Sequence, residues 1–67
     1  MISIKVNSTP HQFHKEDALE HILKKLEIPT NGIALAVNQN IISKTDWHTT
    51  TLNDGDQVLI IKATQGG

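Results

Sequence analysis

The chain of 67 residues contains no cysteine, no arginine and no tyrosine, and its aromatic residues are one tryptophan and one phenylalanine. Without cysteine, the fold cannot be stapled by disulfides, and it has neither a cysteine nucleophile nor a thiolate metal site. Without arginine, and with a net charge of -1, the chain lacks the basic surface typical of proteins that bind nucleic acid. A disulfide-rich secreted scaffold is therefore excluded, and we expect no nucleic-acid partner.

Long apolar runs are also missing. A run such as Val58 to Ile61 is far shorter than the roughly 20 residues that span a membrane. The N-terminus has no basic segment followed by an apolar one, so we expect a cytoplasmic protein with no membrane partner. A chain of this size forms at most one domain and has little room for a deep cleft. This favours a protein that presents a chemical group over one that encloses a substrate.

The start of the chain predicts two strands. Residues 2 to 6 alternate strictly between apolar and polar side chains, which is the pattern of a strand with one buried face. Residues 7 to 10 have the chemistry of a turn. We expect a second strand over about residues 11 to 14, antiparallel to the first, with Phe13 in the core.

The second half of the chain predicts three further strands. Residues 33 to 37 alternate large and small apolar side chains, residues 38 to 40 form a turn, and Ile41-Ile42 begins a short partner strand. Residues 57 to 63 form the most apolar strand. Its continuous apolar run predicts a central strand with both faces at least partly occupied.

Residues 17 to 26 predict the one helix. Apolar side chains at helical spacing line a single stripe, which consists of Leu19, Ile22, Leu23 and Leu26. We expect Asp17 to cap the N-terminus and Glu20 to complete a capping box. Pro29 bars continuation of the helix, and Asn31-Gly32 marks its exit.

This order of elements predicts an α+β fold of the β-grasp, or ubiquitin-like, type. One helix covers only one face of a sheet, so we expect a mixed sheet of four to five strands with the helix packed on one side. We assign residues 1–63 to the β-grasp domain and residues 64–67 to a flexible C-terminal tail.

The sequence ends in Gly66-Gly67, preceded by Gln65. A terminal carboxylate is ionised at neutral pH and is a poor electrophile, so it reacts only after conversion to an activated ester. Activation requires the chain end to enter the narrow site of a nucleotide-binding enzyme. Glycine permits this close approach because it has no Cβ. We therefore expect the working group to be the carboxylate of Gly67, with Gly66 and Gln65 forming the tail that carries it.

The C-terminal half also resembles the sulfur carrier proteins of thiamine biosynthesis, a ubiquitin-like family. The resemblance is carried by residues 33–39, Trp47, residues 53–61 and the terminal Gly66-Gly67. The N-terminal half is similar to the family only in its pattern of elements.

The resemblance implies a carrier that is a co-substrate, not an enzyme, and that binds no cofactor of its own. An adenylating enzyme similar to ubiquitin-activating enzymes would use ATP and Mg²⁺ to form an acyl adenylate on Gly67. Sulfur delivered as a persulfide from a cysteine desulfurase would displace AMP and give a thiocarboxylate. A thiazole synthase would then take that sulfur for the thiazole ring of thiamine.

A second site is expected on the sheet face that the helix leaves open. If Val58 and Ile60 face the helix, the intervening side chains of the strand face the other way. An exposed apolar patch often docks a partner, so we expect the adenylating enzyme to bind there. The expected docking residues are Leu59, Ile61, Ala34 and Ala36, with Lys5 at the margin.

Other chemical signals in the sequence are explained without a site. His11 and His14 lie on opposite faces of a strand because their separation is odd, so they do not share a metal ion. Turn formation explains Asp54 and Asp56. We predict neither a metal site nor catalytic residues.

Two other interpretations stay open. The small subunit of molybdopterin synthase has the same fold and the same terminal thiocarboxylate but serves a different acceptor. A β-grasp binding module, or a ubiquitin-like modifier joined to lysines of other proteins, would use the fold differently. A binding module would function without Gly66-Gly67, and a modifier would form higher-mass adducts in cells.

Overall fold

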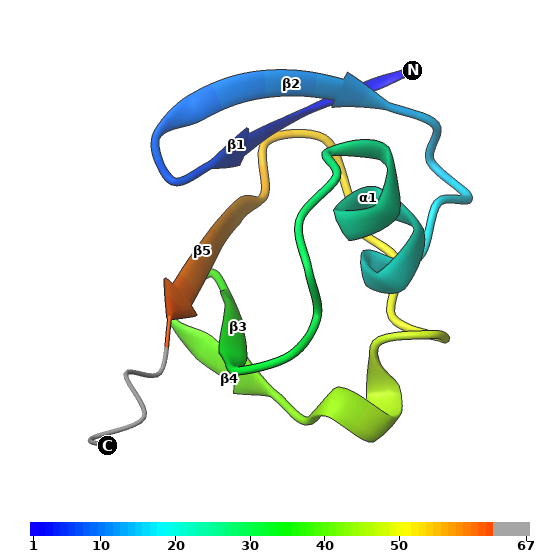
Figure 1. The fold of residues 1–67 in the computed structure, drawn as a ribbon. Coiled ribbons are helices and arrows are strands. Elements are labelled where there is room, and N and C mark those ends of the chain that lie inside the picture. Colours follow the sequence, from blue (N-terminus) through cyan, green and yellow to red (C-terminus); the bar gives the residue numbers. More distant parts are fainter. Residues whose placement is uncertain (63–67) are drawn as a thin grey trace.

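The computed structural model describes residues 1–62, which form a five-stranded sheet with one α-helix on one face (Figure 1). The elements are β1 (Ile2–Val6), β2 (Thr9–Phe13), α1 (Leu19–Lys25), β3 (Ile33–Val37), β4 (Asn40–Ile42), the 3-10 helix η1 (Lys44–Asp46) and β5 (Gln57–Lys62). The strand order is β2-β1-β5-β3-β4, with β1 and β5 parallel and the other neighbours antiparallel. The predicted α+β fold with a mixed sheet is confirmed.

The core lies between α1 and the covered face of the sheet. The alternation in β1 buries every second residue, as predicted, and the stripe of α1 packs against it. The most fully buried side chains are Ile4, Leu19, Ile22, Leu23, Leu35 and Leu52. Burial of one such side chain stabilises the fold by about 1.5–3 kcal/mol, so the core on this side of the sheet is the main source of stability.

β5 is the central strand, as predicted, but only one of its faces is covered, which corrects the expectation that both faces would be at least partly occupied. Val58 is buried beneath α1, whereas Leu59 and Ile61 are exposed. The continuous apolar run is typical of a strand that is covered on both faces. Here the single helix covers one face of the sheet, so the apolar side chains on the opposite face of β5 stay exposed to solvent.

Two hairpins turn in two residues, which corrects the predicted strand boundaries. Asn7 and Ser8 have φ values of 49° and 71°, and Asn38 and Gln39 have φ values of 49° and 73°. Positive φ at both central positions is the type I′ geometry that matches the twist of paired strands. Because such turns are short, β2 begins at Thr9 and β4 at Asn40. Pro10 is tolerated in β2 because β2 is an edge strand.

The helix begins later than predicted, and Asp17 does not cap it. The N-cap residue is Ala18, which makes no side-chain cap hydrogen bond. The N–H groups of Leu19 and Glu20 instead donate to the carbonyl oxygens of Thr50 and Trp47, at 2.9 and 3.1 Å. The predicted capping box of Asp17 and Glu20 is therefore wrong, because a distant loop supplies the acceptors.

The helix ends at Lys25, one residue before its predicted end and well before the exit signal at Asn31-Gly32. Glu27 takes the left-handed conformation with φ of 57°. The N–H of Ile28 donates to the carbonyl of Leu23 at 2.9 Å, and the N–H of Glu27 donates to Lys24 at 3.1 Å. This pair of bonds is a Schellman motif, which normally has glycine at the position of Glu27.

Candidate functional site

The chain leaves the described structure from the middle of the sheet. The central strand β5 ends at Lys62, which pairs with Ile33 of β3. The predicted continuation of this strand to Ala63, and the tail at 64–67 with Gln65, Gly66 and Gly67, lie outside the described residues. A chain of five residues reaches at most about 17 Å. Any enzyme that held the terminal carboxylate would therefore lie close to the end of β5.

The open face of the sheet brings together the predicted docking residues. In the register of β3 and β5, Ala36 stands opposite Leu59, and Ala34 stands opposite Ile61. Leu59 and Ile61 are 51% and 40% exposed. Ala34 is half-buried. Ala36 lies on the same face but is buried, because it sits between two larger side chains, so it forms the floor of the patch.

One large apolar residue of this face was missed. Ile41 of β4 pairs with Ala36 and is 66% exposed, which places it on the open side, with Ala36 between it and Leu59. The signal was present in the sequence, because Ile41 and Ile42 are adjacent in a strand and must face opposite ways. Ile42 packs against the core, so Ile41 cannot.

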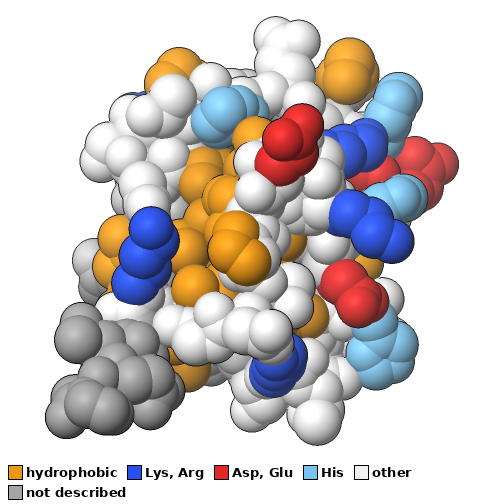
Figure 2. All heavy atoms as spheres, in the orientation of Figure 1, with side chains coloured by type: hydrophobic (Ala, Val, Ile, Leu, Met, Phe, Trp, Pro, Cys, Tyr) orange, Lys and Arg blue, Asp and Glu red, His pale blue; other side chains and the backbone are white. Residues whose placement is uncertain are grey.

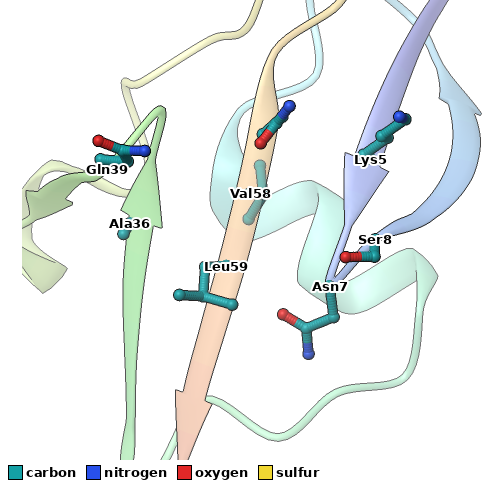
Figure 3. A pocket seen from close by; sticks show the side chains of 8 residues that line it. Lys5, Asn7, Ser8, Ala36, Gln39, Val58 and Leu59 are labelled. Atoms are coloured by element: carbon teal, nitrogen blue, oxygen red, sulfur yellow. The ribbon is translucent and has the colours of Figure 1, made fainter.

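A shallow hollow adjoins the patch, and Lys5, which was expected at the margin of the patch, is one of the residues that line the hollow. Lys5 of β1 pairs with Gln57 at the start of β5. Figure 3 looks onto the hollow between β1, β5 and β3, with α1 behind the sheet. Its lining residues are Lys5, Asn7, Ser8, Ala36, Gln39, Gln57, Val58 and Leu59. Among the described residues, Lys5 forms no ion pair within 4.0 Å.

Most charged and histidine side chains gather on one side of the face that Figure 2 shows. Figure 2 shows most of the visible acidic and histidine side chains gathered on the side where α1 lies. Asp17 belongs to this side and is almost buried, with its carboxylate 2.7 Å from the Nζ of Lys25 and 3.5 Å from the Nδ1 of His21. The hydrogen bond from Lys25 holds the pKa of Asp17 below its usual value of 3.8, although burial opposes this shift. The Asp17 carboxylate therefore links the segment before α1 to the last turn of the helix.

The turn before β5 uses its acidic residues as predicted. The carboxylate of Asp54 accepts the N–H of Ser3 at 2.7 Å, and that of Asp56 accepts the N–H of Asn53 at 2.8 Å. The Nδ2 of Asn38 also donates to Asp56, at 3.0 Å. Both carboxylates therefore hold the loop between the strands.

Within residues 1–62, no cluster of three or more His, Cys, Asp or Glu side chains has the arrangement of a metal site. In the same range, no helix has both the length and the apolar character needed to cross a bilayer.

The chain is similar to known proteins both in sequence and in structure. The family model described as the ThiS family matches residues 4–67. The sulfur carrier protein ThiS of Escherichia coli (strain K12) is 30% identical over 66 residues, covering 98% of this chain and 100% of that protein. The uncharacterized protein ycf40 of Pyropia yezoensis is 32% identical over 66 residues, covering 98% of this chain and 93% of that protein.

A solved structure agrees with the fold. The structure of a thiamine biosynthesis protein (ThiS) from Geobacter metallireducens matches with a TM-score of 0.84. It covers 98% of this chain and 100% of its own, at 20% sequence identity. The β-grasp architecture is thus shared even where most residues differ.

Proposed function

This chain belongs to the ThiS family, and we propose that it is a sulfur carrier of thiamine biosynthesis whose working group is the carboxylate of Gly67. The observation that carries the proposal is the extent of the family match. It runs over residues 4–67 and so includes both the central strand β5 and the terminal Gly66-Gly67. In this function the chain is a co-substrate of other enzymes and holds no cofactor.

The chemistry begins with activation of the carboxylate. An oxygen of Gly67 attacks the α-phosphorus of ATP on an adenylating enzyme, which uses Mg²⁺, and pyrophosphate leaves. The terminal sulfur of a persulfide, supplied through a cysteine desulfurase, then attacks the acyl carbon and expels AMP. A second thiol cleaves the resulting S–S bond, which releases the thiocarboxylate and leaves a disulfide on the donor. A thiazole synthase takes the sulfur from that thiocarboxylate. Because the first step consumes ATP, we place the protein in the cytoplasm.

The tail residues Gln65 and Gly66 are proposed to carry Gly67 into the enzyme. Two successive residues without side chains at the tip let the backbone enter a narrow passage, where a Cβ would meet the wall. The sheet remains outside the passage because it is far wider than an extended chain.

The open face is proposed to dock the adenylating enzyme. Leu59 and Ile61 lie on the strand that leads directly to the tip, within reach of any enzyme that holds it. Exposed apolar side chains gathered in this way are typical of interaction surfaces. The docking residues are Leu59, Ile61, Ala34 and Ala36, with Lys5 at the margin.

Intact-mass analysis tests the proposed function. The protein is incubated with a candidate adenylating enzyme, ATP, Mg²⁺ and a persulfide donor. We expect a mass increase equal to the replacement of one oxygen by sulfur, and fragmentation should locate it at Gly67. The matched variants carry one added alanine, either after Gly67 or before Met1. The first should stay unmodified and the second should react normally. Equal reaction of both variants would contradict the role of Gly67.

A further inference from the structure

Two asparagines hold the central strand β5 from opposite sides, and each begins a hairpin turn. The Oδ1 of Asn38, in the turn between β3 and β4, accepts the N–H of Gln57 at 3.0 Å. The Oδ1 of Asn7, in the turn between β1 and β2, accepts the N–H of Ile60 at 2.8 Å. Both asparagines have φ of 49°, which this residue type tolerates better than most. Each turn therefore connects the two strands of its hairpin and also accepts a hydrogen bond from β5.

Asn7 continues the ladder between β1 and β5 beyond the end of β1. The parallel register pairs Val6 with Val58, and the N–H of Asn7 donates to the carbonyl of Val58 at 2.9 Å. At Asn7 the main chain turns away into β2, so the side chain supplies the next acceptor, for Ile60. Figure 3 shows the Asn7 side chain lying beside β5. Without it, β5 at Ile60 would be paired by β3 alone.

We propose that Asn7 is a positioning residue for sulfur transfer, because it fixes β5 as far as Ile60 and so sets the point from which the terminal residues reach an enzyme. This inference rests on the proposed function above. Without the bond to Asn7, the end of β5 would be held by β3 alone, through the pairs Leu35–Ile60, Ala34–Ile61 and Ile33–Lys62. The position of Lys62 relative to the open face would then be less well fixed, so an enzyme docked on that face would meet the terminal residues in the right place less often.

Three substitutions separate the positioning role from a structural one. Asn7→Gly removes the acceptor but keeps a residue that adopts positive φ without strain, so the turn survives. Asn7→Asp keeps both an acceptor oxygen and tolerance of positive φ, and serves as the rescue variant. Asn38→Gly removes the corresponding acceptor at the start of β5, far from Lys62, together with the bond from the Asn38 Nδ2 to Asp56.

Two readouts are measured on each variant: amide hydrogen exchange by NMR, and the kinetics of thiocarboxylate formation with varied carrier concentration. For Asn7→Gly we expect exchange at Ile60 to rise about tenfold, the factor that corresponds to one ordinary hydrogen bond. We also expect a several-fold higher KM for the carrier with an unchanged kcat. Asn7→Asp should behave as the wild type. Asn38→Gly should speed exchange at Gln57 and leave the KM unchanged.

Three results would overturn the inference. Normal exchange at Ile60 in Asn7→Gly would show that the contact does not hold β5. Faster exchange with an unchanged KM would show that the contact is only structural. An equal rise in KM for Asn38→Gly would show that any loosening of β5 suffices. If the wild type itself forms no thiocarboxylate, the proposed function fails, whereas the exchange rates still decide whether Asn7 holds Ile60.

Discussion

Val58 and Leu59 are neighbours in one strand, yet Val58 is 4% exposed beneath α1 while Leu59 is 51% exposed on the open face. The same contrast separates Leu35 from Ala34 in β3 and Ile42 from Ile41 in β4. In these three strands both faces carry apolar side chains. What separates the two faces there is whether a helix lies over them.

The contrast between the covered and the open face separates the residues that stabilise this small domain from those available to bind a partner. Apolar side chains on the covered face leave water on folding, and their burial is the main favourable term. Leu59, Ile61 and Ile41 gain much less, because a large part of each stays in water. Their presence on an uncovered sheet is better explained by a partner that covers them than by folding.

The largest expected effect comes from making the same truncation on each face. Leu35→Ala on the covered face should lower the free energy of unfolding by about 2–5 kcal/mol, because it removes a fully buried side chain and leaves a cavity. Leu59→Ala on the open face should lower it by less than about 1 kcal/mol. Urea denaturation followed by circular dichroism measures both.

A domain of this size has a free energy of unfolding of only about 3–5 kcal/mol, so Leu35→Ala could leave the protein unfolded. That outcome would also agree with the prediction. Equal losses for the two variants would break the comparison, because they would mean that the open face also contributes a core.

An intermediate effect is expected when charge is placed on the open face. Ile61→Glu should weaken binding to the adenylating enzyme at least about tenfold, since an unpaired carboxylate would have to be buried in an apolar contact. The free energy of unfolding should change by less than about 1 kcal/mol, because Ile61 is exposed in the free protein.

The control for this variant is Gln12→Glu, which adds the same charge on β2 at the far edge of the sheet. Titration calorimetry measures the affinity of each variant for the adenylating enzyme. Binding that is unchanged by Ile61→Glu, or equally weakened by Gln12→Glu, would remove the assignment of the docking surface to the end of β5.

The sequence predicted the covered face better than the turns, for a physical reason. Alternation in residues 2–6 and the helical spacing of Leu19, Ile22 and Leu23 follow directly from which face is buried. Positive φ at Asn7-Ser8 and Asn38-Gln39 depends on the twist of the paired strands. Neither pair contains the glycine that usually reveals such a turn, so the strands were placed one or two residues too late.

The N-terminus of the helix was predicted poorly because its hydrogen-bond partners are distant in sequence, whereas the end was predicted to within one residue. The expected cap, Asp17, faces Lys25 instead, while the N–H groups at the start of α1 use Trp47 and Thr50. A local motif cannot reveal a contact that only the folded chain creates. On the open face, Leu59, Ile61 and Lys5 were placed correctly by alternation alone, and Ile41 was missed although the same rule covers it.

The smallest expected effect is on the pH dependence of stability, through Asp17 at the edge of the covered face. Asp17 accepts hydrogen bonds from Lys25 at 2.7 Å and from the N–H of His14 at 3.0 Å, and its side chain is 8% exposed. These contacts hold its pKa in the folded protein below the usual 3.8. A group whose pKa is lowered by folding contributes stability above its unfolded pKa and loses that contribution as pH falls through the folded pKa.

Thermal unfolding of wild type and Asp17→Asn across pH 2 to 7 tests this effect. The wild type should be the more stable protein at pH 7. The difference in unfolding temperature between the two proteins should become smaller below about pH 3.8, as the carboxylate takes up a proton. Glu16→Gln, on the exposed neighbouring residue, should track the wild type throughout. A difference that stayed constant with pH would mean that Asp17 acts through shape and not through charge. The covered side would then be held by packing alone, so the contrast between the two faces would rest entirely on buried apolar area.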